Sequence, residues 1–271
     1  MNRKGKIMKK LFTVGIICAA LVLGSGNAFS AGTYLVYDPE AVSGTTENHV
    51  VAAMTSLGYT FVTRSYLNPV TPADLTTAGY EALIVGWSVG GNYSGLTAVG
   101  TAGISGNAVI TGHDADYHTW SYDTYGGNDA AKIVMKRMVD FAGAAAETGI
   151  VAFPEADATP FDYLPSSWLI GSVGSIGSNN VTGITPDGVA SGFYNGLTTA
   201  DLSNWNTSFH AYFTAWDGSK FKSFELGQYG GDYSKVITIG TTVTPLPTPE
   251  PSILILLGCG LLGLLGLGKR D

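Results

Sequence analysis

The sequence predicts an α/β domain with a single open, mostly parallel, doubly wound sheet, to which the second half of the chain adds β-hairpins. Two patterns favour this class. In residues 31–153, short apolar segments alternate with segments whose apolar residues recur at helical spacing, an order typical of parallel strands joined by helices. In residues 209–242, three strand-like segments follow one another without a helical segment, which indicates hairpins at the sheet edge. No internal repeat is found, and we expect one domain over residues 31–243.

The first half of the chain supplies most of the expected elements. Residues 71–74 (Thr-Pro-Ala-Asp) begin a helix, because they combine an N-cap, a proline at the first helical position and an acid in the first turn. Residues 80–87 are almost continuously apolar, as in a strand that a parallel sheet buries on both faces. The longest helix is expected where Ile133, Met138 and Phe141 recur in helical period. The predicted strands are residues 33–37, 60–66, 80–87, 107–111 and 149–153, and the predicted helices are residues 50–57, 71–78 and 128–142.

The second half has weaker patterns. Residues 165–184 are rich in Gly, Ser and Asn, and no element is expected there. Strands are predicted at residues 209–216, 221–229 and 235–242. The Pro/Thr-rich residues 244–248 form an extended linker in this prediction.

The first 30 residues have the three parts of a secretory signal peptide. Five basic residues precede residue 11, an apolar run covers residues 11–23, and Ala28-Phe29-Ser30 places small residues where signal peptidase requires them. The apolar run is shorter than the roughly 20 residues that a membrane-spanning helix needs. We therefore expect export of the chain and cleavage after Ser30.

A second signal lies at the C-terminus. Pro249-Glu250-Pro251 is followed by the uncharged apolar residues 252–268 and then by Lys269 and Arg270. This order resembles the PEP-CTERM sorting signal of Gram-negative bacteria that make exopolysaccharide. The resemblance implies that residues 252–268 form a transmembrane helix in the inner membrane, until an exosortase cuts near Pro249-Glu250-Pro251 and releases or transfers the domain at the cell surface. A permanent single-span anchor is the alternative.

The charge of the exported part argues against nucleic acid as a partner. Five of the 14 basic residues lie in residues 1–30, and two basic and two of the 21 acidic residues follow residue 248. The seven basic and 19 acidic residues that remain give residues 31–248 a net charge near −12. Such a domain repels phosphate backbones and anionic lipid heads.

The order of elements in residues 33–241 resembles the class I glutamine amidotransferase-like fold, which is flavodoxin-like. The residues that carry this resemblance are the strand 80–87 after a short helix, the junction 110–113 (Ile-Thr-Gly-His), and residues 189–201 ahead of His210. The resemblance implies a flavodoxin-like sheet with a histidine near the ligand site.

In true glutamine amidotransferases, the turn after the strand corresponding to residues 107–111 presents a cysteine nucleophile. Both cysteines of this chain, Cys18 and Cys259, lie in the two targeting segments. The absence of a cysteine from the mature domain excludes cysteine-dependent amidotransferase activity. We do not expect a serine to take its place.

Residues 113–118 bring four reactive side chains together, His113, Asp114, Asp116 and His118. They follow a predicted parallel strand, and α/β sheets bind ligands at the carboxyl ends of their strands. Imidazoles and carboxylates suit a divalent metal such as zinc, or acid–base catalysis. In the alternative, the two aspartates cap the loop backbone and His113 packs against Trp120. No other cofactor is expected.

His210 is a further catalytic candidate beside His113 and Asp114. It begins an aromatic strand in the region where the related fold places a histidine, although a lone histidine is more often structural. His49 is expected to be a solvated residue of the first helix.

Three aromatic residues, Trp120, Tyr122 and Tyr125, lie in a polar, Gly-rich segment. We expect this segment to be a surface loop whose rings stack on carbohydrate, although aromatic rings more often pack in a core.

These observations predict a secreted, exosortase-processed protein of the cell surface or of the exopolysaccharide matrix of a biofilm. We expect a non-catalytic binding or structural module whose partner is extracellular polysaccharide. The alternative is an extracellular metal-dependent or acid–base hydrolase of a carbohydrate-type substrate, which uses the side chains of residues 113–118.

Overall fold

The structure is a computed structural model. It describes residues 32–39, 49–77, 79–87, 91–102, 104–120, 129–153, 162–174, 177–178, 180–203, 205 and 207–241. The chain divides into two compact units, of which Ala31–Val243 holds all the described residues and the other comprises Met1–Ser30 and Thr244–Asp271. The predicted signal peptide, linker and sorting signal therefore lie outside the described residues. Within the described ranges, no helix is both long and apolar enough to cross a membrane.

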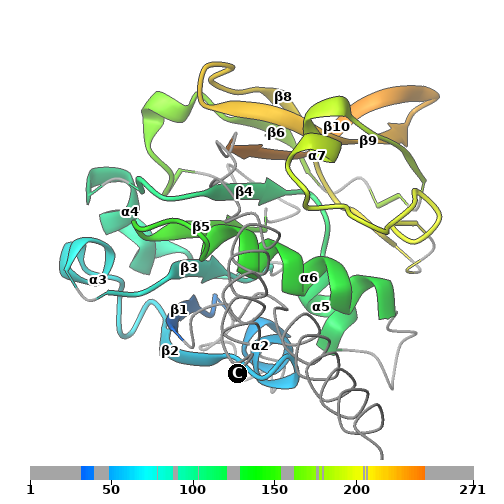
Figure 1. Ribbon diagram of the computed structural model, residues 1–271. Coiled ribbons are helices and arrows are strands. Elements are labelled where there is room, and N and C mark those ends of the chain that lie inside the picture. The colour runs from blue at the N-terminus through cyan, green and yellow to red at the C-terminus, as the bar shows by residue number, and fades with distance from the viewer. Residues whose placement is uncertain are drawn as a thin grey trace, which may run out of the picture. The chain divides into compact units, whose positions relative to one another are not determined.

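Ten strands of the described chain form one open, mixed sheet (Figure 1). Its main path runs β2-β1-β3-β5-β4-β10-β8-β6, while β9 pairs with β10 and β7 pairs with β9. The first five strands are parallel to one another: β1 (Thr33–Tyr37), β2 (Thr60–Arg64), β3 (Ala82–Val85), β4 (Ala108–Thr111) and β5 (Gly149–Ala152). The α/β class is therefore confirmed.

The second half of the chain adds only antiparallel pairs. Its strands are β6 (Gly171–Val173), β7 (Val181–Ile184), β8 (Tyr212–Ala215), β9 (Phe221–Tyr229) and β10 (Asp232–Thr241). β10 joins the two halves, because it lies antiparallel to β4 with Thr238 opposite Thr111. The expectation of a mostly parallel sheet thus holds for the first half alone, and the sheet as a whole is mixed.

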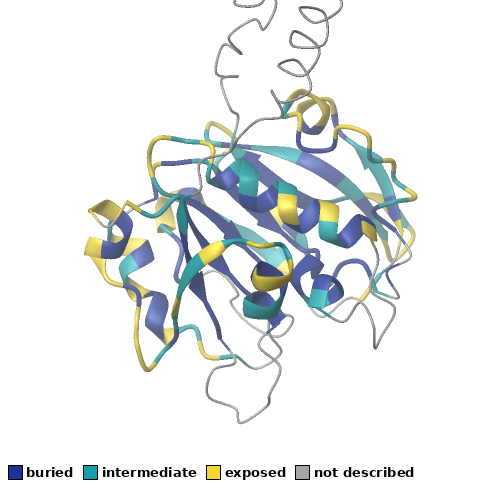
Figure 2. Cartoon of the chain, turned by 60° about the horizontal axis from the view of Figure 1, so that its bottom comes forward, coloured by how far each residue is buried: buried dark blue, intermediate teal, exposed yellow. Residues whose placement is uncertain are grey.

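Helices cover both faces of the parallel strands. On one face, apolar side chains are buried by α2 (His49–Ser56), α5 (Ala115–Trp120) and α6 (Asp129–Ala142); on the other, by α3 (Pro72–Thr76), the 3₁₀ turn η1 (Ser94–Leu96) and α4 (Thr97–Ala102). Every residue of β3, β4 and β5 is buried, as the continuous apolar runs predict. Figure 2 shows the strands buried between helices that are exposed on their outer sides.

The β9–β10 hairpin turns at Gly230 and Gly231, whose φ angles are 61° and 83°. A two-residue turn with positive φ at both positions matches the right-handed twist of the strands, and glycine adopts it without steric cost. The hairpin expected in the second half is therefore present, and β9 has the bounds predicted for it.

Other boundaries differ from the expectations. The strand predicted at residues 209–216 is limited to β8, because Phe209 instead forms isolated bridges to His113 and Ser178. β6 and β7 lie in residues 165–184, where no strand was expected, and their half-exposed residues give no clear alternation. The short α4, α5 and α7 (Pro186–Ala190) and the 3₁₀ turn η2 (Ser166–Trp168) were also not predicted.

Candidate functional site

The candidate site lies where β3 and β4 end at the carboxyl edge of the parallel strands. Directly after β4, the backbone at Gly112 lies very close to that of Ala211, and a Cβ atom at this position would overlap the carbonyl group of Ala211. The close approach lets the His210 backbone N–H donate to the Gly112 carbonyl oxygen at 2.8 Å. Gly112 therefore allows a segment almost 100 residues later in the chain to place His210 beside Asp114.

Asp114 is the centre of the site. Its carboxylate is 2% exposed, and its Oδ2 atom lies 3.1 Å from His210 Nε2 and 3.3 Å from His118 Nε2. Burial alone would raise the pKa of this carboxyl, but the hydrogen bonds and the charge of the two histidines lower it to about 2. The structure thus holds an ionised carboxylate between two imidazoles.

His118 reaches Asp114 because residues 115–120 form α5, which places positions i and i+4 on one side of the helix. This helix corrects the expectation that residues 113–118 form a loop. His118 Nε2 also lies 2.8 Å from the Thr207 carbonyl oxygen. Burial would lower the pKa of His118, but the hydrogen bond to Asp114 and its charge raise the pKa above the usual value.

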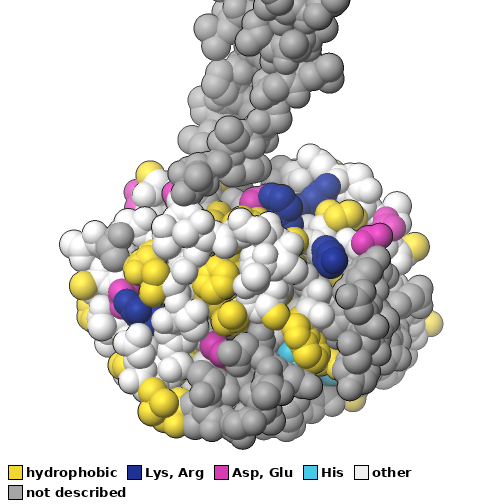
Figure 3. Space-filling view, turned by 90° about the horizontal axis from the view of Figure 1, so that it is seen from below, with side chains coloured by type: hydrophobic (Ala, Val, Ile, Leu, Met, Phe, Trp, Pro, Cys, Tyr) yellow, Lys and Arg dark blue, Asp and Glu magenta, His cyan; other side chains and the backbone are white. Residues whose placement is uncertain are grey.

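An aromatic cluster lies beside the carboxylate. The Trp87 ring centroid is 5.2 Å from that of His210 and 6.4 Å from that of His49. His49 in turn lies 4.9 Å from Tyr117 and 4.4 Å from Trp120. His49 is buried, so the expectation of a solvated residue was wrong, whereas Trp87, Tyr117, Trp120 and His210 are half-buried. In Figure 3, a small area of histidine surface is visible beside hydrophobic side chains.

Trp120 does not lie in a surface loop, since it is the last residue of α5 and packs within this cluster. Asp116 belongs to the same helix, and its Oδ2 atom accepts a hydrogen bond of 2.8 Å from the Trp87 backbone N–H. Asp116 thus ties α5 to the end of β3. Tyr122 and Tyr125, the other predicted carbohydrate contacts, lie outside the described residues.

Four buried polar atoms around the carboxylate make no hydrogen bond: Asp114 Oδ1, His118 Nδ1, Thr119 Oγ1 and Trp87 Nε1. A buried polar atom without a partner costs about 1–3 kcal/mol. Native proteins concentrate such atoms where water or a ligand supplies the missing bond. The site therefore has four polar atoms that are shielded from solvent and lack a protein partner, next to a cluster of buried and half-buried aromatic rings.

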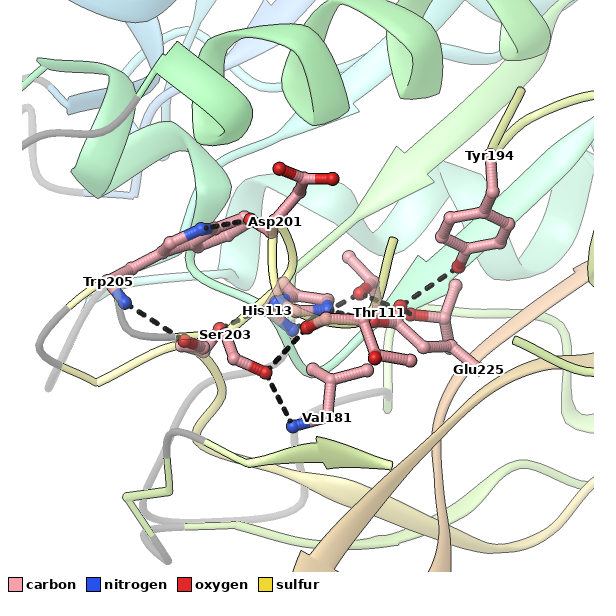
Figure 4. A network of polar contacts seen from close by, with 11 residues as sticks. Thr111, His113, Val181, Tyr194, Asp201, Ser203, Trp205 and Glu225 are labelled. Carbon is pink, nitrogen blue, oxygen red and sulfur yellow. Dashed lines mark hydrogen bonds and ion pairs between the residues drawn. The ribbon is translucent and has the colours of Figure 1, made fainter. Parts of the chain in front are cut away.

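His113 belongs to a different arrangement, which Figure 4 shows. It is fully buried, with Nδ1 2.6 Å from the Ser208 carbonyl oxygen and Nε2 2.8 Å from Glu225 Oε1. Its ring packs on Trp205 and Phe209, and not on Trp120 as the structural alternative supposed. Burial would lower the pKa of His113, but the charge of Glu225 and the hydrogen bonds to Glu225 and Ser208 raise it.

Glu225 is fully bonded on its second oxygen as well. Tyr194 and Thr238 donate hydrogen bonds of 2.9 and 3.0 Å to Oε2, and Thr238 lies 2.9 Å from the hydroxyl of Thr111. Burial and the neighbouring Glu225 raise the pKa of Tyr194 well above its usual value, so its hydroxyl stays a donor. This network fastens the end of β4 to β9 and β10.

The structure therefore separates the histidines that the sequence placed together. Asp114, His118 and His210 converge, while both ring nitrogens of His113 are bonded to protein acceptors, which leaves it no lone pair for a metal. Among the described residues, no group of three or more His, Cys, Asp or Glu side chains is arranged to hold a metal ion. A bound metal stays a prediction.

Two residues of the site region were missed by the sequence analysis. Glu225 is the one acidic residue in the predicted strand 221–229, which was a usable signal. Trp87 was expected as a strand end and as one of five tryptophans that could stack on sugars, but not as part of this site, although residues 86–90 (Gly-Trp-Ser-Val-Gly) have the spacing G-x-S-x-G directly after β3. That pattern was overlooked when a serine nucleophile was set aside.

Comparisons with protein-family models, with curated proteins and with solved structures found no match to this chain.

Proposed function

We propose that the chain is an exported protein of the cell surface or extracellular matrix whose domain binds carbohydrate at the carboxyl edge of its parallel strands. The signal peptide in residues 1–30 and the PEP-CTERM-like end in residues 249–271 support export and processing by signal peptidase and an exosortase. The order β2-β1-β3 supports a flavodoxin-like, glutamine amidotransferase-like origin of the domain. The next two parallel strands, β5 and β4, follow in the reverse of the flavodoxin order, and β10 and its neighbours are an antiparallel addition.

The observation that carries the binding proposal is the ionised Asp114 carboxylate, which has one buried oxygen without a hydrogen bond and a half-buried aromatic cluster beside it. A sugar ring presents hydroxyl groups that donate to a carboxylate and apolar C–H faces that pack on aromatic rings. Trp87 Nε1 is a further unused donor in the same cluster. Carbohydrate therefore matches the site chemically.

The charge of the domain supports the choice of a neutral glycan over an anionic ligand. Residues 31–248 carry a net charge near −12, from seven basic and 19 acidic residues. This charge disfavours phosphate-rich partners such as nucleic acid. Extracellular polysaccharide of low negative charge is the partner that we propose.

Binding is tested with the full chain, purified after export and titrated with neutral oligosaccharides by calorimetry. Asp114→Asn preserves the shape of the side chain but removes the ionised acceptor, so we expect at least a tenfold weaker affinity. Asp187→Asn makes the same chemical change at an exposed position of α7 and is expected to bind like the wild type. Equal affinity of the Asp114→Asn and wild-type proteins would contradict the proposed site.

A further inference from the structure

We propose that Asp114 and His210 form an acid–base pair that hydrolyses ester bonds, with His210 Nδ1 as the atom that takes the proton from the attacking hydroxyl group. This activity goes beyond carbohydrate binding, and it rests on the proposed binding only for the identity of its substrate, an acyl ester carried by a polysaccharide.

The hydrogen bond between the two side chains sets the tautomer of His210. An ionised carboxylate only accepts hydrogen bonds, so the 3.1 Å contact between Asp114 Oδ2 and His210 Nε2 places the imidazole proton on Nε2. In the neutral ring, the lone pair then lies on Nδ1. No described residue bonds to Nδ1, and the side chain is 22% exposed, so this atom is available to a substrate.

Three contacts hold the pair in place. The His210 backbone N–H is bonded to the Gly112 carbonyl oxygen at 2.8 Å, and the Trp87 ring lies against the imidazole with 32° between the ring planes. His118 gives Asp114 Oδ2 a second contact at 3.3 Å. A base held in this way meets its substrate without first being ordered, which is how positioning lowers a reaction barrier.

His113 provides an internal comparison. Both of its ring nitrogens are bonded to protein atoms and its side chain is fully buried, as a structural histidine requires. His210 has one nitrogen bonded to a buried carboxylate, one nitrogen unbonded by the described chain, and partial exposure. A carboxylate that orients an imidazole in this manner is the arrangement by which hydrolases make a general base.

The reaction balances with water as co-reactant. The attacking oxygen forms a bond to the acyl carbon as its proton moves to His210 Nδ1, and the proton then passes to the alkoxide oxygen as the ester C–O bond breaks. The products are an alcohol and a carboxylic acid. If a serine hydroxyl attacks first, the acyl group is held on that serine, and water releases the acid through the same proton transfers.

The test measures hydrolysis of p-nitrophenyl acetate and butyrate by the full chain, purified after export. We expect His210→Ala to lower kcat/KM about 10²–10⁴-fold, the usual contribution of a general base, and added imidazole to restore part of the rate. Asp114→Asn should lower kcat more than it changes KM, and Asp114→Glu, which keeps an ionised acceptor, should restore part of the rate. A purely structural role for Asp114 would lower the activity only in proportion to the loss of folded protein.

The controls make the result decisive. Circular dichroism shows whether each variant folds, and His210→Gln, which keeps the side-chain volume, replaces His210→Ala if the latter does not. A folded wild type that turns over ester no faster than His210→Ala overturns the proposal.

Failure of this activity and failure of carbohydrate binding are distinguishable, because the chromogenic esters contain no sugar. Ester hydrolysis without oligosaccharide binding would support the pair and contradict the proposed function. Oligosaccharide binding without ester hydrolysis would support the proposed function and contradict the acid–base pair.

Discussion

His113 Nε2 lies 2.8 Å from Glu225 Oε1, and neither side chain is exposed to solvent. The two residues are 112 positions apart, and their contact joins the end of β4 to β9 across β10. A buried pair of this kind is costly to break, because the partner that remains is left charged or unsatisfied in a dry interior. The pair therefore supports the segment from which Asp114 projects.

Glu225→Ala is expected to lower the free energy of unfolding by about 3–5 kcal/mol, since it leaves the His113 ring, the Tyr194 hydroxyl and Thr238 without their common acceptor. Urea unfolding followed by tryptophan fluorescence measures the change. Glu147→Ala, at an exposed position, serves as the control and should change stability by less than about 0.5 kcal/mol. Similar stabilities of the two variants would show that the network does not hold the fold.

The lowered pKa of Asp114 predicts that the folded state loses stability in acid. Its pKa is lowered from 3.8 to about 2 in the folded state, where burial opposes ionisation but the bonds to His118 and His210 outweigh it. The folded state is thereby stabilised above about pH 4, by about 2 kcal/mol, and this contribution disappears as the pH falls through 2. Unfolding free energies measured from pH 5 to pH 2 should fall less steeply for Asp114→Asn than for the wild type. Parallel curves would contradict the ionised carboxylate.

His118 acts in the opposite direction. Its pKa is raised above 6.5, because the bond to Asp114 and its charge outweigh burial. Its contribution is complete below about pH 6.5 and is lost as the pH rises through the folded-state pKa. The difference in stability between wild type and His118→Asn should therefore shrink between pH 6 and pH 9 in urea titrations. A difference that does not depend on pH in this range would count against a charged His118.

Gly112→Ala is expected to destabilise the protein by at least about 2 kcal/mol, because the new Cβ would overlap backbone atoms of Ala211. Backbone atoms cannot move aside by a change of rotamer, as the end of a side chain can. It should also displace His210 from Asp114. Gly218→Ala is the matched control, since nothing lies within 4 Å of its added Cβ. Thermal unfolding of the two variants gives the comparison, and equal midpoints would contradict the close approach at Gly112.

Sorting is tested separately by the intact mass of the surface-located protein. If residues 249–251 direct cleavage, the mature chain lacks residues 252–271. Replacing Pro249 and Pro251 by alanine should leave the tail attached, whereas the same change at Pro245 and Pro247 in the linker should not. A wild-type mass that includes residues 252–271 would instead support a permanent anchor.

The sequence predicted those elements that carry a clear local pattern. β9 was located by its aromatic and apolar residues, and α3 by its N-cap, since Thr71 and Asp74 form the reciprocal bonds of a capping box. α5 was missed because the helix is only six residues long and five of them are polar or aromatic residues with little helical preference, so that it depends on contacts such as that of Asp116 with the Trp87 backbone.

The candidate site was predicted only in part, because its contacts also depend on residues that are far apart in the sequence. The pattern of residues 113–118 indicated the correct edge of the sheet, and His210 was named beside it. Spacing alone could not show that His113 turns towards Glu225 while His118 and His210 share Asp114, because two of these contacts join distant parts of the chain: Glu225 and His210 are 112 and 96 positions from their partners. The burial of His49 likewise depends on Trp87 and Trp120, which come from separate elements.

The position of β10 has a consequence for the order of folding. β10 is the last strand among the described residues, yet it lies within the sheet and pairs with β4, and Thr111 and Thr238 are 127 positions apart. Until residues 232–241 have been synthesised, β4 has a free edge of unpaired backbone groups, which is prone to pair with other chains. The nascent chain therefore stays incompletely folded until nearly all of the domain exists, and its unpaired β4 edge requires protection from aggregation during that time.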